Sequence, residues 1–467
     1  MSGTRVIVIG GGLSGITAAL SCARGGATVT LLEQRGRLGG AACSVTRGAL
    51  RVDKSQHVFL GACTAYRELL ADLDAEALIT LQPRLEIPIL QPGAAPMRLR
   101  RRRLSAPLHR DWPGAGYRHL SAADRLGFAR ALRALCRIDP TDPEADRQSF
   151  GEWLAGHRQS SAAVEMLWRL IIRPVLNLDP ASATLAQVAK VLQTALLAAR
   201  SAGDIGYPRV PLSEIHDRAA RRALQAAGVD VRLRHGVTQV SRLGTGFCVE
   251  VNAVPTIDAD VVVLAAPPDQ AARLMPTASA VTATQGVHLR RSAIVDVHVV
   301  LDRVVLDVSC ALGVRSPVQW VFDRTTDSGL RDGQYLVVSL CVADSEAIMS
   351  VDDLGDRYLP ALRDLVPNMR HAELRDFFVT REPASACGPA PGAGGPPPGA
   401  VDGIPGLVLA GSWTDTGWSM TMEGAVRSGQ AAATAALAAD ARHASLGRPA
   451  PEVRPAAVLA DTGEARV

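Results

Sequence analysis

Residues 6–15, V-I-V-I-G-G-G-L-S-G, say most about how this 467-residue chain folds. A short apolar run enters glycines spaced G-x-G-x-x-G, and an apolar segment follows, as a dinucleotide-binding turn requires. Gly10 permits the tight turn, Gly12 lets the backbone approach a pyrophosphate, and Gly15 lets helix and strand pack closely. The stretch therefore predicts a strand, a turn that binds a nucleotide, and a helix.

An acidic residue completes this motif at the end of a second strand. A helix that begins at Leu13 and Ser14 would direct backbone N–H groups at phosphate oxygens. The apolar run 28–32 then leads to Glu33, whose carboxylate can accept both hydroxyls of an adenosine ribose. This order of elements predicts a nucleotide-binding βαβ unit rather than a glycine-rich loop of an ordinary α/β domain. It does not by itself distinguish FAD from NAD.

A second glycine element, E-Q-R-G-R-L-G-G at residues 33–40, follows the acid directly. It resembles the element of flavoproteins built like amine oxidases and carotenoid desaturases, in which the chain passes along the pyrophosphate toward the flavin. Simple nicotinamide dehydrogenases lack it, so the resemblance implies FAD. Ala41 stands where many members of the superfamily place an arginine. The residues of this element that the resemblance places at the cofactor are Glu33, Gln34, Arg35, Arg37, Leu38, Gly39 and Gly40.

Composition excludes several other classes of function. A hydrophobic content of 47% with 21% charged residues is typical of a soluble globular protein, and a net charge of +4 is too small to indicate a nucleic-acid partner. The eight cysteines form no C-x-x-C pair, which excludes the commonest zinc and iron–sulfur spacings, so we expect no metal site and reduced thiols in a cytoplasm. We find no run of about 18 apolar residues and no signal peptide.

The nucleotide-binding domain is expected to be discontinuous. Strand-like segments return at 231–240 and 247–251, and 258–267 reads as a buried strand that ends in a small-residue turn. In the resembling flavoproteins these strands belong to the FAD domain, which places the backbone of Val237 at the adenine and Ala266 at the cofactor. Between the pieces, helical spacing occurs at 122–137 and 149–172, and strands at 293–301, 318–322 and 335–342 precede a helix at 351–365.

We therefore predict an α/β fold: a glutathione-reductase-type, Rossmann-like FAD-binding domain, discontinuous in sequence, with an inserted α+β substrate domain. The FAD-binding parts are 1–79, 216–289 and 401–446, and the substrate-domain parts are 80–215 and 290–382. Residues 383–400 are predicted to be a Pro/Gly loop, and 447–467 a disordered tail.

The end of the chain carries a further flavin signature, L-A-G-S-W-T at 409–414 followed by M-E-G-A-V-R-S-G at 422–429. It resembles the C-terminal FAD motif of squalene and carotenoid flavoenzymes, and implies cofactor contacts at Gly411, Ser412, Met422 and Glu423. A helix beginning near Met422 would aim N–H groups at the flavin pyrimidine oxygen, where negative charge gathers on reduction. Many relatives carry an aspartate where Ser412 stands.

Three families of flavoenzyme, which act on different substrates, are candidates for this chain. The pattern Q-H-x-x-L-G at 56–61 resembles hydroxysqualene dehydroxylases of squalene and hopanoid synthesis, as do W-T-D-T-G at 413–417, A-P-L-H at 106–109 and L-N-L-D-P-A-S-A at 176–183. That family usually shows D-N-G-Q-H, from which Lys54 and Ser55 depart. Desaturases of linear isoprenoids are the second reading. Amine oxidases generally carry a lysine in the strand near 290–301, where this chain has none. A flavin-free prenyl-lipid-binding protein is the non-enzyme alternative, although such proteins have a degraded glycine loop.

The leading resemblance implies that reduced FAD converts hydroxysqualene to squalene with loss of water, which requires a general acid for the hydroxyl. We expect His57 to be that acid, Gln56 to orient it or the substrate, and Asp53 to be its charge partner. Alternatively, His57 and Asp53 merely fix a turn beside the flavin. Trp168, within an apolar helical stripe, and Asp415 and Trp418, before the last helix, are candidates for the substrate pocket, or else core and turn residues.

Arginines occupy five of the six positions 98–103. This cluster is either a solvated strand or an anionic-lipid contact beside the substrate entrance. We therefore expect a cytoplasmic protein that can lie peripherally at the inner face of the cell membrane. The chain shows no second nucleotide fingerprint, so the electron donor is expected to be external.

Overall fold

The computed structural model describes residues 3–101, 117–275 apart from 197, 200 and 253, 289–389, 400–401 and 404–445. The nucleotide-binding part is built on a six-stranded sheet in the order β10-β2-β1-β14-β21-β20. Five of its strands are parallel, and β20 pairs antiparallel to β21. The strands come from three separate stretches of sequence: β1 (Arg5–Ile9), β2 (Thr28–Glu33), β10 (Asp230–Leu233), β14 (Val261–Leu264), β20 (Ala400–Val401) and β21 (Ile404–Leu409).

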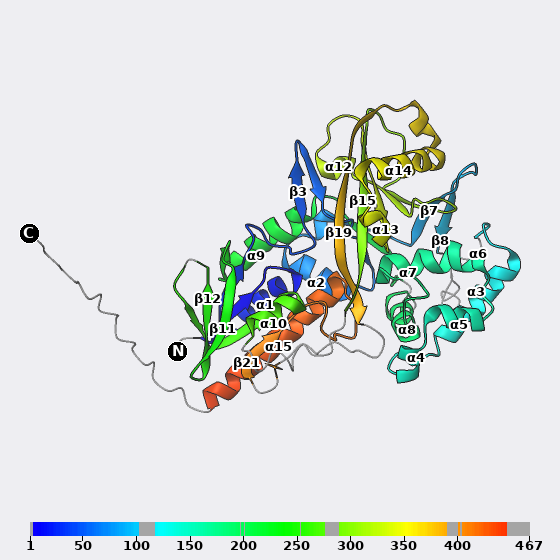
Figure 1. Ribbon diagram of the computed structural model, residues 1–467. Helices are drawn as coiled ribbons and strands as arrows, with labels where there is room; N and C mark the ends of the chain where they lie inside the picture. Colours follow the sequence, from blue (N-terminus) through cyan, green and yellow to red (C-terminus); the bar gives the residue numbers. More distant parts are fainter. Residues whose placement is uncertain are drawn as a thin grey trace, which may run out of the picture.

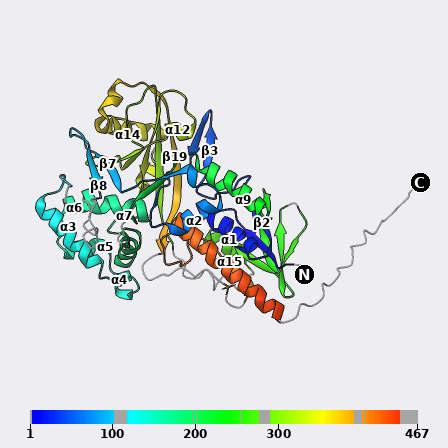
Figure 2. The same ribbon diagram turned by 180° about the vertical axis from the view of Figure 1, so that it is seen from behind.

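Both faces of this sheet are covered, which explains why β14 is apolar at every position and β1 is apolar from Val6 onward. On one face Val6 and Val8 pack with α1 (Leu13–Arg24), α2 (Thr64–Asp72), α9 (Ala220–Ala226) and α15 (Met422–Ser445). On the other face Ile7 and Ile9 pack against the antiparallel sheet of β11 (Val237–Leu243), β12 (Gly246–Val251) and β13 (Ile257–Ala259). Figures 1 and 2 show α15 lying beside α1 along this part.

The second part of the molecule is a seven-stranded sheet in the order β19-β15-β18-β17-β16-β7-β8. The helix α14 (Val351–Leu365) packs on one face through Leu354, Tyr358 and Leu362. The strands are β7 (Glu86–Leu90), β8 (Met97–Arg100), β15 (Leu289–Leu301), β16 (Cys310–Gly313), β17 (Trp320–Asp323), β18 (Gln334–Leu340) and β19 (Leu374–Pro389). Short helices α12 (Thr325–Ser328) and α13 (Asp344–Ala347) connect them.

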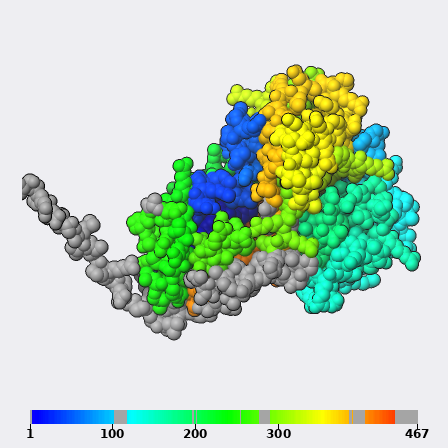
Figure 3. Space-filling model, in the orientation of Figure 1, coloured from blue at the N-terminus to red at the C-terminus, as the bar shows by residue number. Residues whose placement is uncertain are grey.

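A helical lobe lies beside this sheet, as Figure 3 shows in cyan to sea-green. Its helices are α3 (Ala122–Leu135), α4 (Pro143–Arg147), α5 (Phe150–Gly156), α6 (Ser161–Ala163), η4 (Val164–Trp168), α7 (Arg169–Leu176), α8 (Leu185–Val191) and η5 (Leu192–Leu196). A hairpin of β3 (Ser44–Arg47) and β4 (Leu50–Asp53), and a small sheet of β5 (Phe59–Leu60), β9 (Ile205–Pro208) and β6 (Ile79–Leu81), join the two parts. The helix α10 (Pro268–Leu274) follows β14, and η6 (Glu214–Ala219) precedes α9.

Three boundaries differ from the sequence-based expectations. The segment 231–240 is divided between two sheets, because the chain leaves β10 at Arg234, which adopts a positive φ of 60°. The helix expected over 149–172 is interrupted after Gly156, where Arg158 has φ 52°, and Ser160 caps the next helix. The loop expected from 383 begins later, because β19 pairs with β15 as far as Pro389. Residues 390–399 and the tail 447–467 lie outside the described residues.

Candidate active site

The glycine turn between β1 and α1 is closed on one side and open on the other. Gly10 has φ +110°, and a Cβ there would lie 2.3 Å from the carbonyl oxygen of Ala265. A Cβ on Gly15 would lie 1.9 Å from the carbonyl oxygen of Gly10, so α1 can pack on the turn only with glycine here. A Cβ on Gly12 would meet nothing within 4 Å. The open side at Gly12, next to the amides of Leu13 and Ser14 at the helix start, therefore has room for a pyrophosphate.

Glu33 is buried at the end of β2, beside this turn. Its carboxylate accepts hydrogen bonds of 2.7 Å from the backbone N–H groups of Gly11 and Arg35. A carboxylate has about four acceptor positions, so each oxygen can accept a further bond from a ribose hydroxyl. The chain also passes Glu33 on its way to Val237, since the N–H of His235 donates to the Glu33 carbonyl at 2.9 Å.

The second glycine element lies directly on the turn. The N–H of Gly39 donates to the carbonyl of Gly11 at 2.8 Å, and a Cβ on Gly40 would lie 3.0 Å from the Cα of Gly12. Arg37 donates to the Gly40 carbonyl at 3.1 Å, while Leu38 is fully buried. Gln34 lies near Gly236, before β11. The structure therefore brings Glu33 and residues 38–40 of this element against Gly11 and Gly12.

The C-terminal motif packs against the same glycine turn and helix start, although it comes from the opposite end of the chain. The N–H of Gly411 donates to the Ser428 hydroxyl at 2.9 Å, and Ala266 accepts a 3.0 Å hydrogen bond from the indole of Trp413. Ser412 follows in this turn. A Cβ on Gly429 would lie 2.4 Å from the Ser14 carbonyl oxygen, so α15 packs closely on α1. The predicted helix start at Met422 coincides with the start of α15.

Glu423 has a different role from a side-chain ligand of the cofactor. Its buried carboxylate accepts hydrogen bonds from the backbone N–H groups of Ala65 (3.2 Å) and Tyr66 (2.8 Å) and pairs with Arg427 at 2.7 Å. It therefore caps α2 and fixes the start of α15 against it. Because these partners occupy the carboxylate, we expect Glu423 to contact a flavin only through its backbone.

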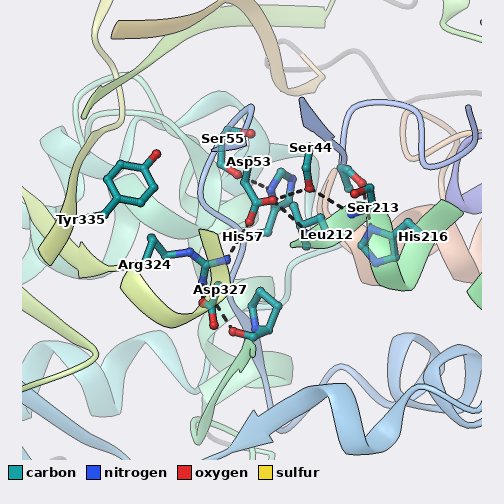
Figure 4. Close-up of polar contacts among 12 residues, drawn as sticks. Ser44, Asp53, Ser55, His57, Leu212, Ser213, His216, Arg324, Asp327 and Tyr335 are labelled. Atoms are coloured by element: carbon teal, nitrogen blue, oxygen red, sulfur yellow. Dashed lines mark hydrogen bonds and ion pairs between the residues drawn. The ribbon is translucent and has the colours of Figure 1, made fainter. Parts of the chain in front are cut away.

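Asp53 does not partner His57, which corrects the sequence-based expectation. Its buried carboxylate accepts hydrogen bonds from the Ser44 hydroxyl (2.6 Å) and the N–H of Leu212 (3.0 Å), and pairs with Arg324 at 2.8 Å (Figure 4). Arg324 also pairs with Asp327 at 2.9 Å. Asp53 is therefore occupied in joining β4 to the substrate-domain sheet.

His57 is also poorly suited to the role of general acid. Burial lowers its pKa, and this effect exceeds the rise caused by the hydrogen bond with Ser55 and by the charge of Asp53. Its Nδ1–H donates to the carbonyl of Ser55 at 2.9 Å (Figure 4), which leaves Nε2 of the neutral ring as an acceptor. The neighbouring Gln56 faces the carboxyl of Asp296 on β15.

A cavity with a free volume of about 160 Å³ lies between β5, the helical lobe and the start of α15. Its walls are almost entirely apolar, and Trp418 and Met422 bring it to the flavin-binding end of the chain. Other lining residues include Val58, Leu60, Ile87, Leu99, Leu167, Leu170, Ile171, Val175, Ile205, Leu312 and Trp320. An enclosure of this character favours a hydrocarbon ligand over a charged one.

Trp168 does not line this cavity, which is a second correction. Its side chain is fully buried against Phe128 and Phe150, and its indole N–H donates to Gln159 at 3.0 Å. Its neighbours Leu167 and Ile171 face the cavity instead. Asp415 lies outside the lining too, with its carboxylate 3.9 Å from Lys190, whose side chain contributes to the cavity wall.

Comparison with known proteins identifies the family. Residues 13–437 match the model of the family described as flavin containing amine oxidoreductase. The chain belongs to this family. It is accordingly an FAD-dependent oxidoreductase with the FAD-binding fold that the two glycine elements indicate.

The similar proteins include enzymes of different activities. A hydroxysqualene dehydroxylase of Rhodopseudomonas palustris is 27% identical over 93% of this chain and 98% of its own length. A second, from Sinorhizobium fredii, is 29% identical over 58% of this chain and 63% of its own length. Among solved structures, the cyclohexylamine oxidase of Brevibacterium oxydans superposes with a TM-score of 0.68 at 19% identity, covering 93% of this chain and 99% of that chain. A putrescine oxidase bound to putrescine gives 0.68 at 20% identity, with the same coverage. These structural likenesses support the fold alone.

The arginine cluster does not form one exposed patch. Arg98 and Arg100 are exposed and both pair with Glu86 of β7, whereas Arg101 is largely buried and pairs with Asp204 at 2.8 Å. Arg102 and Arg103 lie outside the described residues. No helix among the described residues combines the length and apolar character of a membrane span.

Sequence reasoning missed Asp296, Arg324 and Lys190. A signal for Asp296 was present, since a carboxylate interrupts the apolar strand A-I-V-D-V-H-V-V-L at 293–301. Lys190 could have been noticed because the chain contains only two lysines. Arg324 carried none, because its partner Asp53 lies far away in the sequence.

Proposed function

We propose that this protein reduces hydroxysqualene to squalene. The observation that carries the proposal is the similarity to a hydroxysqualene dehydroxylase over 98% of that protein's length. The apolar cavity beside Trp418 and Met422 supports it, because a thirty-carbon hydrocarbon chain needs an apolar enclosure. The motif Q-H-x-x-L-G leads directly into that cavity at Val58 and Leu60.

The reaction replaces a carbon–oxygen bond with a carbon–hydrogen bond. When bound and reduced, FAD would supply the hydride and its two electrons, which an external donor would restore. Loss of hydroxide from an allylic carbon leaves a delocalised cation, so a proton must reach the hydroxyl, which departs as water. The cavity walls would exclude bulk water from that cation, and the segment 53–57 leads into the cavity at Val58.

Within this segment the residues divide by role. Gln56 orients the hydroxyl or the segment itself, and neutral His57 presents Nε2 as a hydrogen-bond acceptor. Asp53 acts on them through the position of the backbone, since its carboxylate is held by Ser44, Leu212 and Arg324. Asp415 and Lys190 close the loop before α15 against the helical lobe.

A desaturase of linear isoprenoids is the second candidate, because the same apolar cavity would hold a polyene. Amine oxidation is disfavoured: no lysine lies on β15, and the cavity lining holds one cation, Lys190, among the described residues. A flavin-free prenyl-lipid carrier is disfavoured by the intact glycine turn with its open side at Gly12.

One anaerobic experiment separates the candidates. The purified flavoprotein is photoreduced and mixed with hydroxysqualene, and flavin absorbance and squalene are followed together. We expect reoxidation of the flavin with one squalene formed per flavin. Absence of turnover with this alcohol, combined with reduction of the oxidised flavin by a polyene precursor, would make the protein a desaturase. A colourless protein that takes up no FAD would favour the carrier.

We further propose contact with anionic lipid through the exposed Arg98 and Arg100, at the cytoplasmic face of the membrane. Replacing both with glutamine should reduce co-sedimentation with anionic vesicles, while Arg303→Gln, another exposed arginine, serves as the control. Unchanged co-sedimentation would contradict this contact.

A further inference from the structure

His216 is a fully buried histidine in η6, the π-helical turn that precedes α9 (Figure 4). Its Nδ1 lies 2.9 Å from the carbonyl oxygen of Ala42, and its Nε2 lies 2.9 Å from the hydroxyl of Tyr66 on α2. A carbonyl oxygen can only accept, so Nδ1 carries the proton and Nε2 accepts from Tyr66. Burial lowers the pKa of His216 to about 4, which keeps the ring neutral at neutral pH. The histidine therefore joins α2 to the chain just after the second glycine element.

The turn over residues 39–42 packs directly on His216. The N–H of Ala42 donates to the carbonyl of Gly39 at 3.0 Å, which closes the turn, and Gly39 and Gly40 adopt positive φ values of 92° and 58°. A Cβ on Gly39 would lie 3.1 Å from the Cβ of His216. The histidine therefore holds this turn both by a hydrogen bond and by close packing.

The turn 39–42 also contacts the glycine turn between β1 and α1. The N–H of Gly39 donates to the carbonyl of Gly11 at 2.8 Å, and a Cβ on Gly40 would lie 3.0 Å from the Cα of Gly12. Gly12 borders the open side that has room for a pyrophosphate. A displacement of the turn 39–42 would therefore change the shape of the predicted pyrophosphate site.

Neighbouring residues of η6 and α9 hold the earlier part of the same element. The Asp217 carboxylate accepts hydrogen bonds from the backbone N–H of Leu38 at 2.9 Å and from the Arg221 side chain at 2.7 Å. Arg221 in turn donates to the carbonyl of Gly36 at 3.0 Å. These bonds reach the backbone of the element, as the bond from His216 does, so η6 and α9 determine where its backbone lies.

Tyr66 links this arrangement to the C-terminal motif. Its side chain is buried, its hydroxyl donates to His216, and its backbone N–H donates to the carboxylate of Glu423 at 2.8 Å. One residue of α2 therefore contacts both the histidine that holds the turn 39–42 and the glutamate that fixes the start of α15. The two flavin signatures, which lie at opposite ends of the chain, are connected through Tyr66.

We propose that His216 is a positioning residue for FAD, which together with Tyr66 holds the turn 39–42 where the pyrophosphate site at Gly12 requires it. His216 acts through the carbonyl of Ala42, and Tyr66 acts by fixing the imidazole ring. A turn that is already ordered need not be ordered when the cofactor binds, and this lowers the dissociation constant for FAD. The inference rests on the predicted pyrophosphate site and is independent of the identity of the substrate.

The test compares FAD binding by the full-length apoprotein with two substitutions of His216. Asparagine can still donate a hydrogen bond to the Ala42 carbonyl, whereas leucine has no donor. We expect His216→Leu to raise the dissociation constant for FAD by about tenfold or more, because the turn must then be ordered when FAD binds. His216→Asn should stay within about threefold of wild type, because the bond to Ala42 is kept. An unchanged constant in His216→Leu, or equal losses in the two variants, would overturn the proposal.

Tyr66→Phe covers the case in which His216→Leu fails to fold. It removes only the hydroxyl that fixes the ring, so we expect the dissociation constant for FAD to rise by about threefold to tenfold. The matched control is Tyr358→Phe on α14, where a buried hydroxyl donates to Glu346 at 3.0 Å within the core of the seven-stranded sheet. This control should bind FAD as wild type does. Quenching of FAD fluorescence gives the constants, and circular dichroism checks the fold. If the two phenylalanine variants bind FAD equally tightly, the proposal is wrong.

Discussion

Arg324, which follows β17, and Asp53, at the end of β4, form a buried ion pair of 2.8 Å that joins the two parts of the molecule. The Asp53 carboxylate also accepts hydrogen bonds from Ser44 and Leu212, so its charge is well satisfied. The pair lies directly before the segment that carries Gln56 and His57. Its position suggests that Asp53 sets where this segment lies and does not take part in proton transfer.

Removing one partner of this pair should be strongly destabilising. Asp53→Ala leaves Arg324 buried with Asp327 as its remaining carboxylate, so we expect the free energy of unfolding to fall by about 3–5 kcal/mol. The control is Asp332→Ala, which breaks the exposed pair with Arg375 and should cost at most about 1 kcal/mol. Urea unfolding followed by circular dichroism compares the two. Equal losses would mean that the Asp53 pair contributes no more than a surface pair.

The two ends of the glycine turn should respond differently to a methyl group. Gly15→Ala places a Cβ against the Gly10 carbonyl, so we expect a loss of about 3 kcal/mol or more and little soluble protein. Gly12→Ala meets no protein atom, so the chain should fold normally while FAD affinity falls by about tenfold or more. Circular dichroism and the flavin absorbance per chain separate folding from binding. A Gly12→Ala protein that binds FAD as tightly as wild type would contradict the assignment of the open side.

The parts of the site that the sequence predicted are those made by local geometry. The turn at Gly10–Gly15 and the acid at Glu33 belong to one βαβ unit, where a strand, a tight turn and a helix leave little conformational freedom. The start of α15 at Met422 was likewise predicted from a contiguous motif. Each requires glycine or an acid at a fixed spacing, and that spacing is visible in the chain itself.

The parts that the sequence did not predict depend on distant partners or on rotation about a helix axis. Asp53 was expected to partner His57 because they are close in sequence, yet its partner Arg324 comes from another part of the chain. Trp168 was expected in the pocket, but η4, a π-helical turn over 164–168, precedes α7 and directs Trp168 into the core and Leu167 into the cavity. The spacing of residues along the sequence determines neither the distant partner of Asp53 nor the direction in which Trp168 points.

The cavity assignment predicts opposite effects for two positions of the helical lobe that lie two residues apart. Leu170→Trp narrows the cavity, so we expect turnover of hydroxysqualene to fall by about tenfold or more while stability changes by less than about 2 kcal/mol. Trp168→Ala empties a packed core and should cost about 3–5 kcal/mol. The molecules that remain folded should keep their rate per bound flavin. Rates normalised to bound FAD, together with thermal unfolding, make the comparison. A lower normalised rate in Trp168→Ala would indicate that Trp168 contributes to the substrate pocket.

Asp296 should also make the stability of the protein depend on pH with a defined sign. In the unfolded chain this aspartate ionises at its ordinary value of about 4, whereas in the native protein it stays protonated up to about 7. Between these values the native state binds more protons than the unfolded state does. Wild-type stability therefore falls as pH rises, by up to about 1.4 kcal/mol per pH unit from this group. Below about pH 4 both states are protonated, and above about pH 7 both are ionised.

Asp296→Asn removes this dependence because an amide does not titrate. The difference in unfolding free energy, variant minus wild type, should increase from about pH 4 to about pH 7 and then level off. Urea unfolding at several pH values measures it, with Asp376→Asn as a matched change on an exposed carboxylate. For that control, the difference in unfolding free energy from wild type should stay nearly constant across these pH values. If the Asp296→Asn curve is also parallel to wild type, Asp296 is ionised in the native protein at these pH values and has a stabilising partner.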